Sequence, residues 1–264
     1  MSTQPPVGDP AADVAGAIDA ASDPETAVAL RRYFQVRPGG YGAGDQFAGV
    51  KLSTLRTIVA PYRRRPFRPQ DWLPLLTSPI HEHRLAALVV MAERAGRGDE
   101  AERQEIYDCY LAHTAYVCNW DLVDVSAAPV VGRHLLEGDR GVLDRLAGSS
   151  SLWERRIAVV ATHAFLRAGQ SADTYRLALR LRDDPEDLIH KAIGWMLREA
   201  GRRVDAGELR RFLDEHGTEL PRTALRAAIE PMTADVRRHY LSRHPTGPGS
   251  AAADRRPTRT GMAG

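Results

Sequence analysis

The middle of this chain carries hydrophobic residues at the three- and four-residue spacing that places side chains on one face of a helix. The two clearest runs are Leu85, Leu88, Val89 and Ala92, and Ile157, Val160, Ala161, Ala164 and Phe165. Strand-like alternation is almost absent. Polar or proline-containing breaks at residues 78–79, 148–150, 183–185 and 220–221 supply N-cap candidates or a proline near a helix start. We therefore predict an all-α body.

The helical runs form a repeat, because a basic residue falls in register in four of them. These residues are Arg84 in HEHRLAAL (81–88), Arg156 in WERRIAVV (153–160), Lys191 in LIHKAIGW (188–195) and Arg226 in TALRAAIE (223–230). The steps between them are 72, 35 and 35 residues, so one further unit is expected near Trp120. Two-helix units of this length stack into an α-solenoid of HEAT-like helical-hairpin repeats. We expect the in-register basic residues to line one concave surface that binds a partner.

Both ends of the chain differ in composition from the body. Residues 1–27 are rich in Pro, Ala, Asp and Gly and contain five acidic residues without any Lys or Arg. Residues 243–264 carry four Arg against one Asp. Such segments have too little apolar content to fold alone. We predict a flexible acidic N-terminal tail (1–27), a HEAT-like repeat domain (28–242) and a flexible basic C-terminal tail (243–264).

The overall composition is that of a globular protein, with 43% hydrophobic, 27% charged and 6% aromatic residues. It argues against collagen-like, wholly disordered and membrane-spanning classes. The N-terminus lacks the features of a signal peptide, and Cys109 and Cys118 cannot build a disulfide framework, so we expect a cytoplasmic protein. Residues 30–242 contain 32 basic and 28 acidic residues, a mildly positive balance that permits a nucleic-acid partner.

The common cofactor and metal motifs do not occur. The glycine-rich segment PGGYGAGD (38–45) lacks the Gly-Lys-Ser/Thr ending of a phosphate-binding loop, and we expect a turn between helices there. His81 and His83 flank Glu82 without the HExxH spacing, so we expect no metal site. No nucleophile elbow is present.

The segment NWDLVD (119–124) is the unusual feature. Trp120 and Asp124 stand four residues apart and therefore share one face of a helix, whereas Asp121 suits an N-cap or a first turn. Related positions of the repeat carry Trp153, Trp195 and Arg198. Core packing or capping explains any one of these residues. Together, a carboxylate, aromatic faces and Arg side chains can attract a cation, hold phosphates and stabilise a developing sugar cation.

Six segments, spanning roughly residues 28–242, resemble the DNA alkylation repair (AlkD-like) family. They are YFQVRPGGYGAGDQFAGVKLSTLR (33–56), SPIHEHRLAALVVM (78–91), NWDLVDVSAAPVVG (119–132), LWERRIAVVATHAFLR (152–167), DLIHKAIGWMLREAG (187–201) and PRTALRAAIE (221–230). The resemblance implies a HEAT-like solenoid DNA glycosylase of base excision repair. Such an enzyme hydrolyses the N-glycosidic bond of N3- and N7-alkylated purines in duplex DNA without a metal or other cofactor, and without the usual flipping of the base into a pocket.

The resemblance also implies roles for single residues. The catalytic aspartate of the family falls on Asp124, and its two DNA-facing tryptophans fall on Trp120 and Trp195. The backbone-binding arginines of the family fall on Arg156 and Arg198, and a tyrosine that contacts the DNA near the lesion falls on Tyr33. The in-register Lys191 is expected at the same DNA-binding face. Trp153 is expected to pack.

The implied mechanism follows from charge. N3- or N7-alkylation makes the purine cationic and thus a good leaving group, while Asp124 stabilises the charge that builds on the deoxyribose and orients water. We expect a monomer, held near the nucleoid through DNA. Two other interpretations stay open, a non-catalytic binder of damaged or branched DNA and a protein-binding HEAT scaffold. The basic in-register positions favour DNA.

Overall fold

The computed structural model describes residues 9–64 and 68–243, and within them the chain is all-α, as the periodicity predicts. The α-helices are α1 (Pro10–Ala20), α2 (Pro24–Tyr33), α3 (Leu52–Val59), α4 (Leu73–Leu76), α5 (His81–Arg97), α6 (Glu100–Ala112), α7 (Trp120–Ala127), α8 (Gly141–Ala147), α9 (Leu152–Arg167), α10 (Ala172–Arg180), α11 (Asp187–Arg203), α12 (Ala206–His216), α13 (Arg222–Ala228) and α14 (Ala234–Arg243). Short 3-10 helices occupy Ala60–Tyr62, Pro69–Trp72 and Thr114–Tyr116, and a π-helical turn, η4, occupies Ala128–Gly132. None of the described helices is both long and apolar enough to cross a membrane.

The helices begin where the sequence breaks predict. Helices α5, α9, α11 and α13 each start one or two residues after a predicted break, and α7 supplies the unit expected near Trp120. At α9 the reason is local, because the Ser151 side chain accepts a hydrogen bond from the backbone N–H of Glu154 and so satisfies one of the free N–H groups of the first turn.

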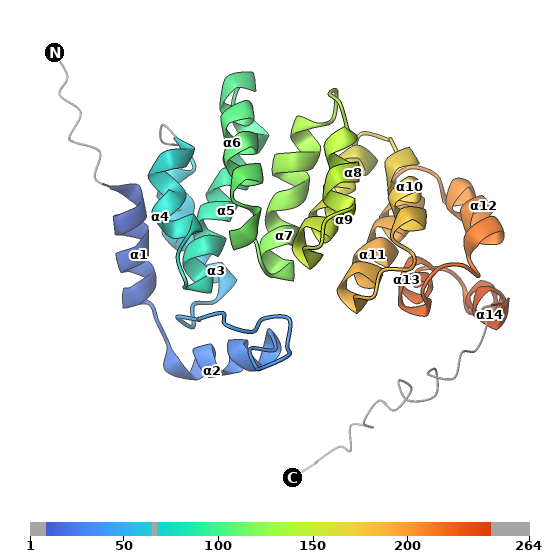
Figure 1. Ribbon diagram of the computed structural model, residues 1–264, viewed down its shortest axis with the longest axis horizontal. Coiled ribbons are helices and arrows are strands. Elements are labelled where there is room, and N and C mark those ends of the chain that lie inside the picture. Colours follow the sequence, from blue (N-terminus) through green and yellow to red (C-terminus); the bar gives the residue numbers. More distant parts are fainter. Residues whose placement is uncertain (1–8, 65–67, 244–264) are drawn as a thin grey trace, which may run out of the picture.

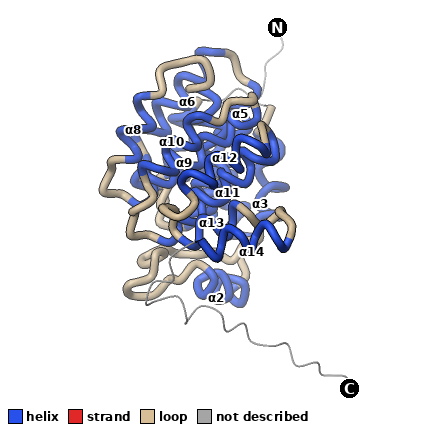
Figure 2. Tube along the Cα trace, turned by 90° about the vertical axis from the view of Figure 1, so that its right-hand side faces the viewer, coloured by secondary structure: helices blue, strands red, loops and turns tan. Residues whose placement is uncertain are grey.

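The helices stack in sequence order as an α-solenoid. Figure 1 shows a curved row from α1 to α14, with α2 and α14 at the two ends of its concave lower side. Helices α5, α7, α9, α11 and α13 each pack against the next member of this series, while α6, α8, α10 and α12 lie between them in the chain. The view turned by 90° again places α2 at the lower edge of the stack (Figure 2).

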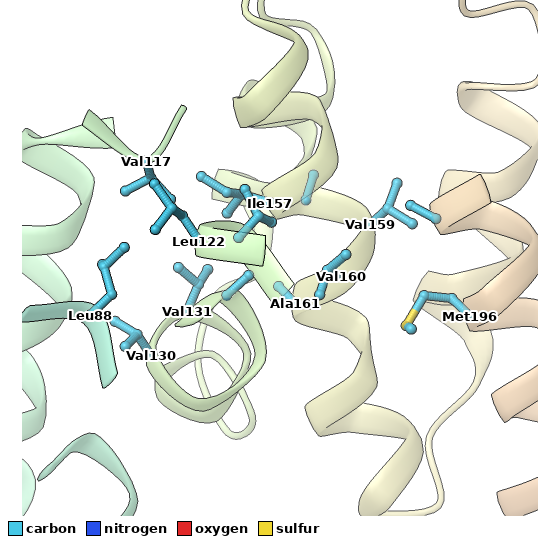
Figure 3. Close-up of a cluster of buried hydrophobic side chains, with 14 of the residues drawn as sticks. Leu88, Val117, Leu122, Val130, Val131, Ile157, Val159, Val160, Ala161 and Met196 are labelled. Carbon is cyan, nitrogen blue, oxygen red and sulfur yellow. The ribbon is translucent and has the colours of Figure 1, made fainter. Parts of the chain in front are cut away.

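The core runs through the whole stack. Leu122 and Val131 of the α7–η4 unit and Ile157 of α9 are fully buried, and their side chains lie close together in Figure 3. Burial of each such side chain stabilises the fold by about 1.5–3 kcal/mol. A single two-helix unit cannot bury these side chains by itself, so each unit depends on its neighbours for stability.

Two glycines allow successive members of the series to approach closely. A Cβ atom at Gly132 would stand 2.1 Å from the carbonyl oxygen of Ala161 in α9. One at Gly194 in α11 would stand 2.6 Å from the carbonyl oxygen of Ala224 in α13. Only a residue without a side chain fits either position, so the spacing between neighbouring helices depends on these glycines.

The predicted N-terminal tail is wrong for residues 10–20 and for residues 24–27, which begin α2. Residues 10–20 form α1, which Asp9 caps, and Ala11, Val14 and Ile18 are buried against α3, α4 and α5. These three residues have the spacing of a helical stripe, which the high Pro, Ala and Asp content of the segment concealed. The described fold therefore starts before residue 28. Apart from Arg243, which ends α14, the predicted C-terminal tail lies outside the described residues.

Candidate functional site

Asp124 lies in the second turn of α7 and pairs with an arginine from the next unit. Arg156 of α9 donates from Nε to Oδ1 at 3.1 Å, and from Nη2 to Oδ1 at 2.9 Å and to Oδ2 at 3.0 Å. Its remaining nitrogen, Nη1, donates to the carbonyl oxygen of Leu188 in α11 at 2.6 Å. The guanidinium therefore joins three successive units and holds the carboxylate in one orientation.

The carboxyl group is largely shielded but not sealed from solvent. The Asp124 side chain is 22% exposed, against 6% for that of Arg156. Burial raises the pKa of Asp124 to about 6, although the charge and hydrogen bonds of Arg156 act in the opposite direction. An open pocket of about 380 Å³ reaches Asp124, and its lining also includes Arg56, Arg63 and Glu93, which pairs with Arg63 at 2.9 Å. With its pKa near 6, the carboxyl group is mostly ionised at neutral pH, and it is accessible from this pocket.

Aromatic side chains surround the start of α7. The indole of Trp120 stacks on Phe34 with the ring centroids 5.2 Å apart, and Tyr33 meets it edge-on at 5.8 Å. The indole Nε1–H donates to the hydroxyl of Tyr41 at 3.3 Å. Tyr33 is 64% exposed, so the cluster presents one tyrosine to solvent at the end of α2.

A buried charge network lies beneath this aromatic cluster. His81, the first residue of α5, contacts Asp45 through Nδ1 and Asp121 through Nε2, both at 2.8 Å. Arg84 donates to the second oxygen of Asp45 at 2.6 Å. Burial disfavours the charged imidazole, but the hydrogen bonds and charges of Asp121 and Asp45 outweigh it and raise the pKa of His81 to about 9. His81 is therefore charged at neutral pH.

The other predicted contact residues lie further along the solenoid. Trp195, half-buried on α11, faces His163 of α9 at a centroid distance of 5.8 Å. Arg198 pairs with Glu230, and the exposed Lys191 pairs with Asp187 at 2.9 Å. Trp153 packs against the core as expected, and its ring also meets that of Tyr41. The structure thus joins Tyr33 to Trp120 and Arg156 to Asp124, and it places Trp195, Arg198 and Lys191 together on α11.

The expectation that all four in-register basic residues line a surface is wrong for two of them. Arg84 and Arg156 are only 4% and 5% exposed, and each pairs with a carboxylate from another segment of the chain. Lys191 and Arg226 are exposed. Contact of Arg156 with DNA stays a prediction, and its observed partners are Asp124 and the Leu188 carbonyl.

Sequence reasoning did not single out Tyr41, Asp45 or His81 for this site. Tyr41 and Asp45 belong to the glycine-rich segment, which does form a turn region between α2 and α3, as predicted. In the sequence, His81 stands out only beside Glu82 and His83, without the spacing of metal ligands. Among the described residues, no group of three or more His, Cys, Asp or Glu could hold a metal ion. The available signal was the clustering of Tyr, Phe and Asp in a segment otherwise made of turn residues.

Comparison with known proteins assigns the chain to a family. The sequence model of the DNA alkylation repair enzyme family matches residues 15–232. The chain is a member of that family. Membership of this family implies that DNA is the substrate of the protein.

A solved structure supports the fold of this family member. It is described as a predicted DNA alkylation repair enzyme from Enterococcus faecalis, and it superposes with a TM-score of 0.64. The two sequences are 19% identical, and the match covers 81% of this chain and 97% of that one. At this identity the likeness concerns the fold alone. No curated protein matches the sequence significantly.

Proposed function

We propose that this DNA alkylation repair enzyme is a DNA glycosylase of base excision repair. It hydrolyses the N-glycosidic bond of N3- and N7-alkylated purines in duplex DNA, and it does so without flipping the base. The observation that carries the proposal is the Asp124 carboxylate, which Arg156 orients and which is open to a pocket. Asp124 lies on α7, the helix that also carries Trp120.

The proposed hydrolysis requires a negatively charged group near the sugar, and it does not require a general acid to protonate the base. An N3- or N7-alkylated purine is already cationic, so the bond between C1′ and the base nitrogen can break with both electrons going to the purine, without protonation. Positive charge then develops on the deoxyribose, where the carboxylate of Asp124 stabilises it. Water adds to C1′, and its proton passes to Asp124 or to solvent. The products are the neutral alkylated base and an abasic site.

The aromatic residues and the outer cations complete the proposed site. The π-face of Trp120, and that of Trp195 on α11, attract the cationic lesion and sugar, at about 0.5–2 kcal/mol each. Lys191 and Arg198 sit in exposed or half-exposed ion pairs with Asp187 and Glu230. Such pairs contribute little to stability, so a DNA phosphate can take the place of the carboxylate partner.

The test is single-turnover excision from duplex DNA that contains N7-methylguanine or N3-methyladenine, with alkali cleavage of the abasic product. We expect Asp124→Asn to lower the rate about 100- to 1,000-fold, because an oriented charge is lost where positive charge develops. DNA affinity should be retained. The matched control is Asp173→Asn, because Asp173 is also ion-paired, with Arg140 at 2.6 Å, but lies on α10.

Two results would count against this function. Equal rates for wild type and Asp124→Asn would remove Asp124 from the chemistry. Binding of alkylated duplex by wild type without any excision would leave a non-catalytic DNA-binding protein. In that case the salt dependence of binding would still report the phosphate contacts.

A further inference from the structure

The loop that joins α2 to α3, residues 34–51, is fixed to the solenoid by buried polar contacts. We refer to it as the Tyr41 loop. The carboxylate of Glu82 accepts three consecutive backbone N–H groups of this loop, from Ala48 at 2.9 Å, Gly49 at 2.9 Å and Val50 at 3.1 Å. Glu82 is 1% exposed, and each of these charge-assisted hydrogen bonds is worth more than a neutral one. The C-terminal half of the loop therefore has one position relative to α5.

A second set of contacts joins the same loop to α7. Asp45 of the loop binds Arg84 and His81 of α5, and His81 binds Asp121 of α7. The ring of His81 also stacks on Phe47 of the loop, with the centroids 4.5 Å apart. Because Asp121 follows Trp120 directly, these contacts fix the position of the loop relative to the start of α7.

Tyr41, in the middle of the loop, contacts residues of three different helices. Its hydroxyl accepts the hydrogen bond from the indole Nε1–H of Trp120 and donates to the carbonyl oxygen of Tyr33 at 3.2 Å. Its ring meets Trp153 of α9 edge-on, with the centroids 6.3 Å apart. One side chain thus links α2, α7 and α9.

We propose that Tyr41 is a positioning residue, which orients the indole of Trp120 through the hydrogen bond to Nε1 while the Asp45–His81–Asp121 contacts hold its loop in place. The inference rests on the proposed function, in which the indole of Trp120 lies next to the reacting sugar. Its consequence is that the loop contributes to the rate of excision without binding the DNA backbone itself.

The experiment compares wild type with Tyr41→Phe, which keeps the ring and removes only the hydroxyl. The matched control is Tyr175→Phe on α10, because the buried hydroxyl of Tyr175 has no hydrogen-bond partner among the described residues. Three quantities are measured for each protein. They are the single-turnover excision rate at saturating enzyme, the affinity for undamaged duplex, and the ¹H–¹⁵N resonance of the Trp120 indole, which is assigned by its loss in Trp120→Phe.

For Tyr41→Phe we expect the Trp120 indole resonance to shift and the excision rate to fall about fivefold, the effect of one typical hydrogen bond. The affinity for duplex should not change, and Tyr175→Phe should behave as wild type in all three measurements. His81→Gln should also shift the Trp120 indole resonance, because it removes the contact that joins Asp45 to Asp121.

Three results would separate the possible failures. An unmoved indole resonance with a wild-type rate would overturn the inference. A wild-type rate with weaker DNA binding would also overturn it, because Tyr41 would then bind DNA. Absence of excision by wild type would refute the proposed function alone, and the indole resonance would still decide whether Tyr41 orients Trp120.

Discussion

Replacement of Arg156 by Gln tests what this arginine does in the site. The substitution keeps a polar side chain of moderate size but removes the positive charge next to Asp124. In the structure all three guanidinium nitrogens of Arg156 bind protein oxygens, two of them those of Asp124. In the variant, the Asp124 carboxyl group would therefore remain buried but would no longer have a positive charge beside it.

The size of the effect follows from the burial of the pair. Breaking a buried ion pair costs about 3–5 kcal/mol, and the 22% exposure of Asp124 places this pair near the lower limit. A loss of roughly 3 kcal/mol lowers the melting temperature of a domain of this size by roughly 6–12 °C. Burial already holds the pKa of Asp124 at about 6 against the effect of Arg156. Without the arginine the pKa moves further upward, so a protonated, inactive Asp124 becomes populated at neutral pH.

The assay is single-turnover excision measured across pH for wild type, Arg156→Gln and a control. In wild type the rate should rise as the pH passes about 6, because the ionised form of Asp124 is the active one. In Arg156→Gln the same rise should occur at higher pH. Arg155→Gln is the matched control, since the neighbouring Arg155 is buried in a similar ion pair, with Asp184 at 2.6 Å. It should lose stability without any displacement of the pH profile.

A different result would refute this reasoning. If Arg156→Gln leaves the pH profile in place but weakens DNA binding and reduces its salt dependence, Arg156 acts on a phosphate. A double-mutant cycle with Asp124→Asn gives a second check. Arg156→Gln should cost less stability in the Asp124→Asn background, because no buried carboxylate is left without its partner.

Two further predictions concern stability. The pKa of His81 is about 9 in the fold against an ordinary 6.5, so the stability that His81 contributes, about 3 kcal/mol, is present below pH 6.5 and is lost as the pH rises through 9. Urea unfolding at pH 7 and 10 should show a larger loss for wild type than for His81→Gln, and equal losses would contradict the assignment. Gly132→Ala should destabilise the protein by about 1–3 kcal/mol or more, because its Cβ would meet the Ala161 carbonyl oxygen. Gly96→Ala, whose Cβ would meet nothing within 4 Å, should be neutral or stabilising in the same thermal unfolding measurement.

Local signals in the sequence were enough to predict the repeated helices of the body and part of the site. The breaks before α5, α9, α11 and α13 are readable because caps and prolines act on the residues next to them. The four-residue spacing of Trp120 and Asp124 predicts that they share one face of a helix, because it matches the helix period. Helix α1 shows the limit of local patterns. Ala11, Val14 and Ile18 are buried only because α3, α4 and α5 cover them, and these helices are distant in the sequence.

The partners of the charged residues were decided by the tertiary structure. An in-register basic residue has the same sequence pattern whether it reaches solvent, as Lys191 does, or a buried carboxylate, as Arg156 does. The contact of Arg156 with Asp124 joins residues 32 positions apart, and that of His81 with Asp45 joins residues 36 positions apart. Such pairs depend on how neighbouring helices and the loop stack, which no local pattern specifies. Local patterns in the sequence were therefore sufficient to predict the all-α class, the repeated helices and the family, whereas the stacking of the solenoid determined which charges meet, where Tyr41 lies and that α1 belongs to the fold.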